Sequence, residues 1–110
     1  MGEFRPGDII LVEIPFTDLS ATKKRPACVL STDGADHLVA FITSRLGQAR
    51  TGDVLVRKSA GNGLAVDSVV LVRKLFTVHS SLIVRKLGKC SHAERRAVVE
   101  AVIAKLQEAI

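Results

Sequence analysis

A cluster of cations before a short apolar segment supplies the residue types that can hold a phosphodiester. Lys23 and Lys24 lead into Arg25-Pro26, and the apolar run 27–30 follows. A later segment ends in Thr43-Ser44-Arg45, which adds two hydroxyls and another cation. A guanidinium can bind two phosphate oxygens at once, and a nearby hydroxyl can hold the same phosphate. The pattern therefore suggests a phosphodiester site at the mouths of two strands, covered by a basic loop over residues 16–26.

Short apolar segments separated by turn residues predict the strands that position this site. The apolar runs Ile9–Val12 and Val69–Val72 are continuous, which favours strands covered on both faces, as in a small barrel. Glycine-containing turns, such as Gly61-Asn62-Gly63, separate the segments. The predicted strands are Asp8 to Ile14, Ala27 to Ser31, His37 to Thr43, Asp53 to Arg57, Ser68 to Val72 and Ile83 to Lys86.

The end of the chain has a different pattern, which predicts a helix. Ser91-His92-Ala93-Glu94 reads as a capping box, in which the serine and the glutamate satisfy each other's backbone N–H groups. Apolar residues then recur at three- and four-residue spacing up to Ile110, which places them on one helix face: Val99, Val102, Ile103, Leu106 and Ile110. We therefore expect one mainly β domain over residues 1–110, a small barrel closed by a C-terminal α-helix.

Charge and composition narrow the class of partner. The formal net charge of +5 at pH 7 and the pI near 9.7 favour an anionic partner, of which nucleic acid is the commonest. Two cysteines and three histidines lie scattered, with neither a disulfide framework nor metal-ligand spacing. The longest apolar run is far below the roughly 20 residues of a membrane helix. We expect a soluble, cytoplasmic protein.

Several ordered segments carry a resemblance to a known family. The chain resembles the MazF/PemK toxins, the mRNA interferases of type II toxin-antitoxin systems, in Gly7-Asp8-Ile9, Arg25–Leu30, Ile42-Thr43-Ser44, Asp67–Val70, Lys74–Thr77 and Lys86–Lys89. The resemblance implies an SH3-like barrel that forms a homodimer. It also implies sequence-selective cleavage of single-stranded RNA without metal or cofactor, and a cognate antitoxin whose flexible segment occupies the RNA groove.

The resemblance also assigns roles to individual residues. It implies that Arg25 and Thr43 are catalytic. An arginine is a poor general base, so Arg25 suits charge stabilisation or acid catalysis. Because successive side chains of a strand alternate, only one of Thr43 and Ser44 is expected to line the site. Further RNA contacts are expected from Ser20, Lys23, Lys24, Ser44 and Lys74.

The loop before Arg25 departs from the family pattern and keeps other functions open. Many relatives carry a carboxylate and often a glycine there, whereas residues 20–24 contain neither. The residue that accepts the proton from the attacking 2′-OH is therefore left open. Two alternatives follow: a toxin of the same fold that poisons a protein target without cleaving RNA, and an SH3-like module that binds RNA or protein.

Overall fold

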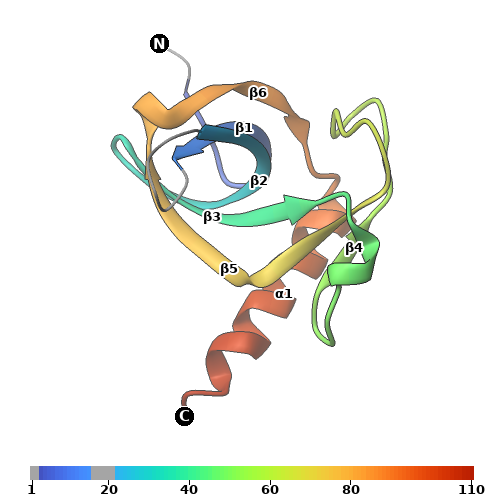
Figure 1. Ribbon diagram of the computed structural model, residues 1–110. Helices are drawn as coiled ribbons and strands as arrows, with labels where there is room; N and C mark the ends of the chain where they lie inside the picture. Colours follow the sequence, from blue (N-terminus) through green and yellow to red (C-terminus); the bar gives the residue numbers. More distant parts are fainter. Residues whose placement is uncertain (1–2, 16–21) are drawn as a thin grey trace.

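Antiparallel strands and a terminal helix form the fold (Figure 1). The computed structural model describes residues 3–15 and 22–110, and these contain six strands and one α-helix. In chain order the elements are β1 (Asp8–Pro15), β2 (Thr22–Asp33), β3 (Asp36–Thr43), η1 (Leu46–Gln48), β4 (Val54–Val56), β5 (Ser68–His79), η2 (Ser80–Leu82), β6 (Ile83–Lys89) and α1 (His92–Gln107). The predicted mainly β class with a C-terminal helix is confirmed.

The strands make one curved sheet in the order β4-β5-β3-β2-β1-β6 (Figure 1). Register shifts interrupt the β1–β6, β2–β3 and β3–β5 ladders, and such irregularities bend strands. Within the described residues no ladder joins β4 to β6. The sheet is therefore open at its two edge strands, and the predicted closed barrel is not confirmed.

The second strand begins earlier than predicted. Residues 22–26, predicted as part of a basic loop, belong to β2 and pair with β1, with Arg25 opposite Val12 and Lys24 opposite Glu13. The predicted strand started after Pro26, because proline has no N–H to donate to a strand ladder. Pro26 pairs with Leu11 of β1, and the β2–β3 ladder begins at the next residue, Ala27.

The fifth strand is also longer than predicted and carries part of the site. Its apolar run stops at Val72, where Arg73 and Lys74 interrupt it, but β5 continues to His79. Its second half pairs with β3, with Leu75 opposite Ala40 and with residues 76–79 opposite residues 36–39. Arg73 and Lys74 lie at a register shift of this ladder, between the two segments of β5 that pair with β3, so pairing on both sides of them keeps them inside the strand.

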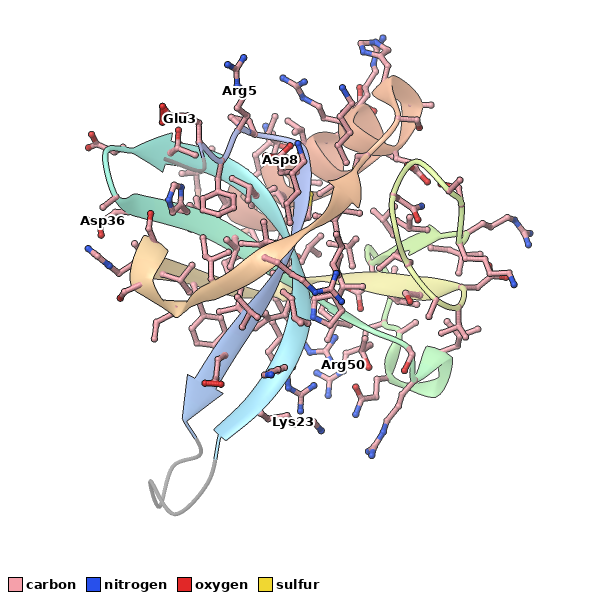
Figure 2. The ribbon with its side chains drawn as sticks, turned by 90° about the horizontal axis from the view of Figure 1, so that it is seen from above. Glu3, Arg5, Asp8, Lys23, Asp36 and Arg50 are labelled. Carbon is pink, nitrogen blue, oxygen red and sulfur yellow. The ribbon has the colours of Figure 1, made fainter. Side chains whose placement is uncertain are left out.

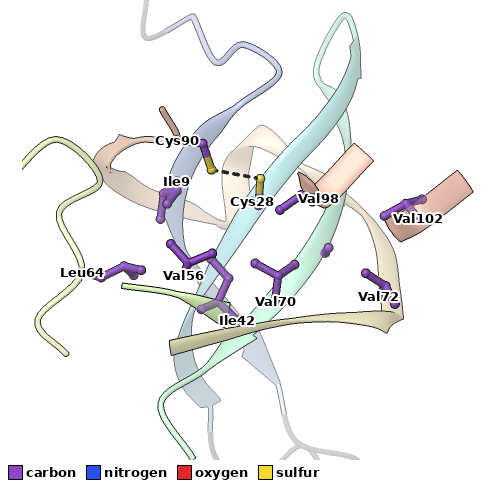
Figure 3. Packing of buried hydrophobic residues seen from close by; sticks show 11 residues of the cluster. Ile9, Cys28, Ile42, Val56, Leu64, Val70, Val72, Cys90, Val98 and Val102 are labelled. Atoms are coloured by element: carbon purple, nitrogen blue, oxygen red, sulfur yellow. Dashed lines mark hydrogen bonds between the residues drawn. The ribbon is translucent and has the colours of Figure 1, made fainter. Parts of the chain in front are cut away.

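Two apolar clusters cover the two faces of the sheet, as the continuous runs predicted. Adjacent residues show this clearly: Ile9 belongs to one cluster and Ile10 to the other, and both are fully buried. The first cluster lies against α1 and contains Cys28 and Cys90, whose sulfur atoms are 3.8 Å apart (Figure 3). Both cysteines are free thiols. The pKa of the Cys28 thiol is raised, mainly by the hydrogen bond with Cys90 and also by burial.

The helix starts where the sequence predicted and buries a narrower face. The capping box is confirmed, with the Ser91 side chain accepting from the Glu94 N–H and the Glu94 side chain accepting from the Ser91 N–H. Val98 and Val102 are buried, whereas most of the predicted apolar face is exposed: Val99, Ile103, Leu106 and Ile110. The helix ends at Gln107 rather than at Ile110. No described helix is long and apolar enough to cross a membrane.

Candidate nucleic-acid interface

A cationic cavity of about 730 Å³ lies where β2 and β5 face the segment between β3 and β4. Five cations line it, from two strands and one loop: Lys23, Arg25, Arg50, Arg73 and Lys74. Two of them, Lys23 and Arg50, are labelled on the same side of the molecule in Figure 2. The part of the lining that the structure describes contains no carboxylate. The cavity therefore favours an anionic ligand.

Strand alternation explains which β2 cations reach the cavity. Lys23 and Arg25 are two residues apart, so their side chains lie on the same face of β2, and both line the cavity. Lys24 lies between them, is exposed, and is not part of the described lining. The structure thus brings Lys23 and Arg25 together and leaves Lys24 outside.

One cavity cation is held by a buried carboxylate. Asp53 Oδ2 lies 3.1 Å from Arg73 Nη1, and the Asp53 side chain is only 3% exposed. The same carboxylate accepts the Arg50 N–H at 2.8 Å and the Val72 N–H at 3.0 Å. These bonds tie the loop that carries Arg50 to β5. In the described part of the chain, the other four cavity cations have no ion pair.

Aromatic and aliphatic side chains line the cavity between the cations. The rings of Phe41 and Phe76 have centroids 4.8 Å apart with a 40° tilt. Phe41 is buried in the second apolar cluster, whereas Phe76 is 48% exposed. The cavity therefore combines positive charge with an accessible aromatic ring, a combination suited to single-stranded nucleic acid.

Thr43, the last residue of β3, and Ser44, which follows it, are not part of the described cavity lining. Thr43 is 6% exposed, and its Oγ1 accepts the Arg45 N–H at 3.1 Å. Ser44 lines a second, shallower hollow of about 500 Å³ that also includes Lys58 and Asp67. Thr43 lies two residues after Phe41, so regular alternation would place it on the cavity side, yet it is recessed at the end of the strand.

Two predicted RNA contacts remain, and only one of them belongs to the residues that the structure describes. Lys74 lines the cavity, as expected for an RNA contact. Ser20 lies outside the described residues. Arg50 and Phe76 are cavity residues to which the sequence assigned no role of their own. Phe76 lies in the segment Lys74–Thr77 that carries part of the resemblance, and its spacing of two residues from Lys74 becomes meaningful once β5 is known to extend past Val72.

Among residues 3–15 and 22–110, no group of three or more His, Cys, Asp or Glu side chains is placed to hold a metal ion.

Comparisons with known proteins agree with this fold. The family model described as PemK-like, MazF-like toxin of type II toxin-antitoxin system matches residues 5–106. Comparison with curated proteins gave no match.

Solved structures share the fold at low sequence identity. The Mycobacterium tuberculosis toxin MazF-mt6 is 22% identical, with a TM-score of 0.68 over 89% of this chain and 96% of that chain. A mycobacterial endoribonuclease in complex with its cognate antitoxin is 16% identical, with a TM-score of 0.70 over 92% of each chain. MazE-MazF from Deinococcus radiodurans is 21% identical, with a TM-score of 0.66 over 94% of this chain and 97% of that chain.

Proposed function

Because the chain belongs to the PemK-like, MazF-like toxin family of type II toxin-antitoxin systems, we propose that it is an endoribonuclease that cleaves single-stranded RNA at selected sequences without a metal ion. The observation that supports this most strongly is the clustering of Arg25 with Lys23, Arg50 and Lys74 in one cavity. We also propose that the curved sheet is an SH3-like barrel opened at its edge strands.

Arg25 is the proposed catalytic residue. In metal-independent RNA cleavage, the 2′-OH attacks the adjacent phosphorus, a five-coordinate phosphorane forms, and the 5′-oxygen leaves with a proton. The negative charge on the non-bridging oxygens increases in this transition state, and a fixed guanidinium binds two such oxygens at once. Arg25 projects into the cavity from a strand paired on β1, so its backbone is held in place before the substrate arrives.

Thr43 is the proposed second member of this site. Its Oγ1 already accepts the Arg45 N–H, so its own O–H hydrogen remains available to donate to a phosphate oxygen. Because Thr43 is recessed at the end of β3, the phosphate must reach that strand end to meet it. Lys24 and Ser44, which are not part of the described cavity lining, remain proposed contacts of the RNA chain. Ser20, which lies outside the described residues, also remains a proposed contact.

Two protein partners complete the proposal. A cognate antitoxin with an acidic segment would compete with RNA for the same cations, because both are polyanions. A second copy of the chain would cover apolar residues that α1 leaves exposed, among them Ile103, Leu106 and Ile110. Both follow the family's biology, and the exposed helix face and the charge of the cavity support them.

The test is cleavage of a long single-stranded RNA in EDTA by wild-type protein and by Arg25→Ala. The matched control is Arg96→Ala, which removes the same type of side chain from an exposed position of α1, where Arg96 is paired with Glu100 outside the described cavity lining. We expect discrete cuts ending in 2′,3′-cyclic phosphate with wild type and Arg96→Ala. We expect Arg25→Ala to be at least about 100-fold slower, as when a transition-state donor is lost.

Other results would redirect the assignment. Intact RNA with folded wild-type protein would favour the module that binds without cleaving. Equal cleavage by Arg25→Ala and wild type would remove Arg25 from the chemistry. Activity that disappears in EDTA and returns with a divalent cation would contradict metal independence.

A further inference from the structure

We propose that Phe76 forms a base-stacking subsite, on which one nucleobase of the bound strand lies while Lys74 holds a neighbouring phosphate. This inference rests on the proposed function, because it names the ligand chemistry of the same cavity. It commits to a nucleobase rather than to an aromatic or acidic peptide side chain.

The Phe76 ring packs against a buried ring and remains accessible. Phe76 is 48% exposed and lines the cavity. Its ring lies against that of Phe41 with centroids 4.8 Å apart and a 40° tilt, and Phe41 is itself 8% exposed and packed in the second apolar cluster. An accessible aromatic ring beside cations is the kind of platform on which bases stack in single-strand-binding proteins.

The spacing along β5 suits a nucleotide. Lys74 and Phe76 are two residues apart on one strand, so their side chains lie on the same face, roughly 6.6 Å apart along it. That separation is comparable with the distance from a nucleobase to the phosphate of its own nucleotide. A cation and a ring at this spacing bind the charged part and the flat part of one nucleotide together.

The charges around the ring argue against an apolar or cationic occupant. Arg25, Arg50 and Lys23 share the cavity with Phe76, and the described lining carries no carboxylate. A ligand there must carry negative charge along its length and present a planar aromatic group to the Phe76 ring. A single-stranded nucleic acid meets both requirements at every residue, because each base has a π-face whatever its identity.

The aromatic content of the chain makes the subsite directly observable. The sequence has no tryptophan and no tyrosine. A Phe76→Trp variant therefore carries a single indole located in the subsite, and stacking of a base quenches its fluorescence. The matched control is Val84→Trp on β6, where Val84 is 44% exposed and outside the cavity lining.

The probe is a 2′-O-methyl RNA oligonucleotide of mixed sequence, which binds as RNA but has no 2′-OH to attack. A second oligonucleotide of equal length has the same phosphates but abasic sugars. We expect saturable quenching of the Phe76→Trp variant by the base-bearing oligonucleotide, and weak or no quenching by the abasic one. The Val84→Trp variant should respond to neither. We also expect Phe76→Leu, which keeps packing against Phe41, to bind the base-bearing strand about 5- to 150-fold more weakly than wild type.

Three results would overturn the subsite. These are equal quenching by both oligonucleotides, unchanged affinity in Phe76→Leu, or a response only to an acidic peptide. Cleavage of ordinary RNA is measured separately on the wild-type protein, because Phe76 belongs to the proposed binding site. Cleavage by wild type without base-dependent quenching of the Phe76→Trp variant removes the subsite and leaves the endoribonuclease proposal intact. Base-dependent quenching of the variant with no cleavage by wild type retains the subsite and removes the endoribonuclease proposal.

Discussion

Asp53 and Arg73 form a partly buried ion pair with a separation of 3.1 Å at the edge of the cationic cavity. Arg73 is 22% exposed, and the carboxylate also accepts two backbone N–H groups, from Arg50 and Val72. The pair joins the loop after η1 to β5. Its main effect is to place Arg50 opposite the β2 cations, while Arg73 itself is neutralised.

Replacing Asp53 should therefore destabilise the fold and weaken RNA binding. In Asp53→Asn the amide NH2 group faces donors where the carboxylate accepted, and Arg73 loses its counterion. We expect the free energy of unfolding to fall by about 2–4 kcal/mol, measured by urea denaturation. Asp67→Asn is the control, because Asp67 is 41% exposed and its partner Arg57 is 80% exposed. Its cost should be below about 1 kcal/mol, and equal costs at the two positions would contradict the argument.

The contribution of the Thr43 hydroxyl to cleavage can be separated from the contribution of the side chain's volume. Thr43→Val keeps the volume and removes the hydroxyl, whereas Thr43→Ser keeps the hydroxyl. If the O–H donates to the scissile phosphate, kcat should fall by about 100- to 1,000-fold in Thr43→Val and change little in Thr43→Ser. Single-turnover cleavage and thermal unfolding are measured on both. A Thr43→Val protein as active as wild type would show that the hydroxyl serves only the turn at Arg45.

Phosphate contacts in the cavity should appear in the salt dependence of binding. Each phosphate neutralised on a single strand contributes about 0.7 to the slope of log affinity against log salt concentration. Lys74→Ala should lower the slope of 2′-O-methyl RNA binding by about that amount. Lys105→Ala removes a lysine paired with Glu108 on α1 and should leave the slope unchanged. Identical slopes for Lys74→Ala and wild type would place the RNA elsewhere.

Gly63 lies so close to β6 that even its replacement by alanine should strongly destabilise the fold. Gly63 has a φ of +71°, and a Cβ there would overlap the backbone carbonyl of Leu87. Gly63→Ala should lower the free energy of unfolding by about 2–4 kcal/mol. Gly47→Ala is the control, because a Cβ at Gly47 meets nothing within 4 Å. Chemical denaturation of both variants tests the difference, and a neutral Gly63→Ala would refute this packing.

The hydrogen bond between the two buried thiols raises the pKa of Cys28 and lowers the pKa of Cys90, and the shift at Cys28 predicts a loss of stability at alkaline pH. The pKa of Cys28 is raised above its ordinary value of 9.0 by the hydrogen bond with Cys90 and by burial. Above pH 9.0 the unfolded chain loses this proton while the folded chain keeps it, so the stabilisation present below pH 9.0 is lost as pH rises. The slope approaches about 1.4 kcal/mol per pH unit for one such group. Cys28→Ala should show a shallower fall between pH 9 and 10 in urea denaturation, and an unchanged slope would contradict this assignment.

The strand cores and the helix start could be predicted because their signals are local. The capping box at Ser91 needs only residues three apart, and the buried runs at Ile9 and Val69 are readable as uninterrupted apolar segments. The true lengths of β2 and β5 could not be predicted. Pro26, Arg73 and Lys74 each read as a strand end. Pro26 stays in the sheet by pairing with Leu11 of β1, whereas Arg73 and Lys74 lie at the irregularity between the two segments of β5 that pair with β3.

The sequence by itself determined the β class, the terminal helix, and the identity of Arg25, Lys23 and Lys74 as phosphate-binding candidates. Only the tertiary structure decided that these residues share a cavity with Arg50 and Phe76 and that Thr43 is recessed. The reason is physical: side chains distant in the chain meet through strand register and buried ties such as Asp53–Arg73. Those long-range contacts leave no periodic pattern in the sequence.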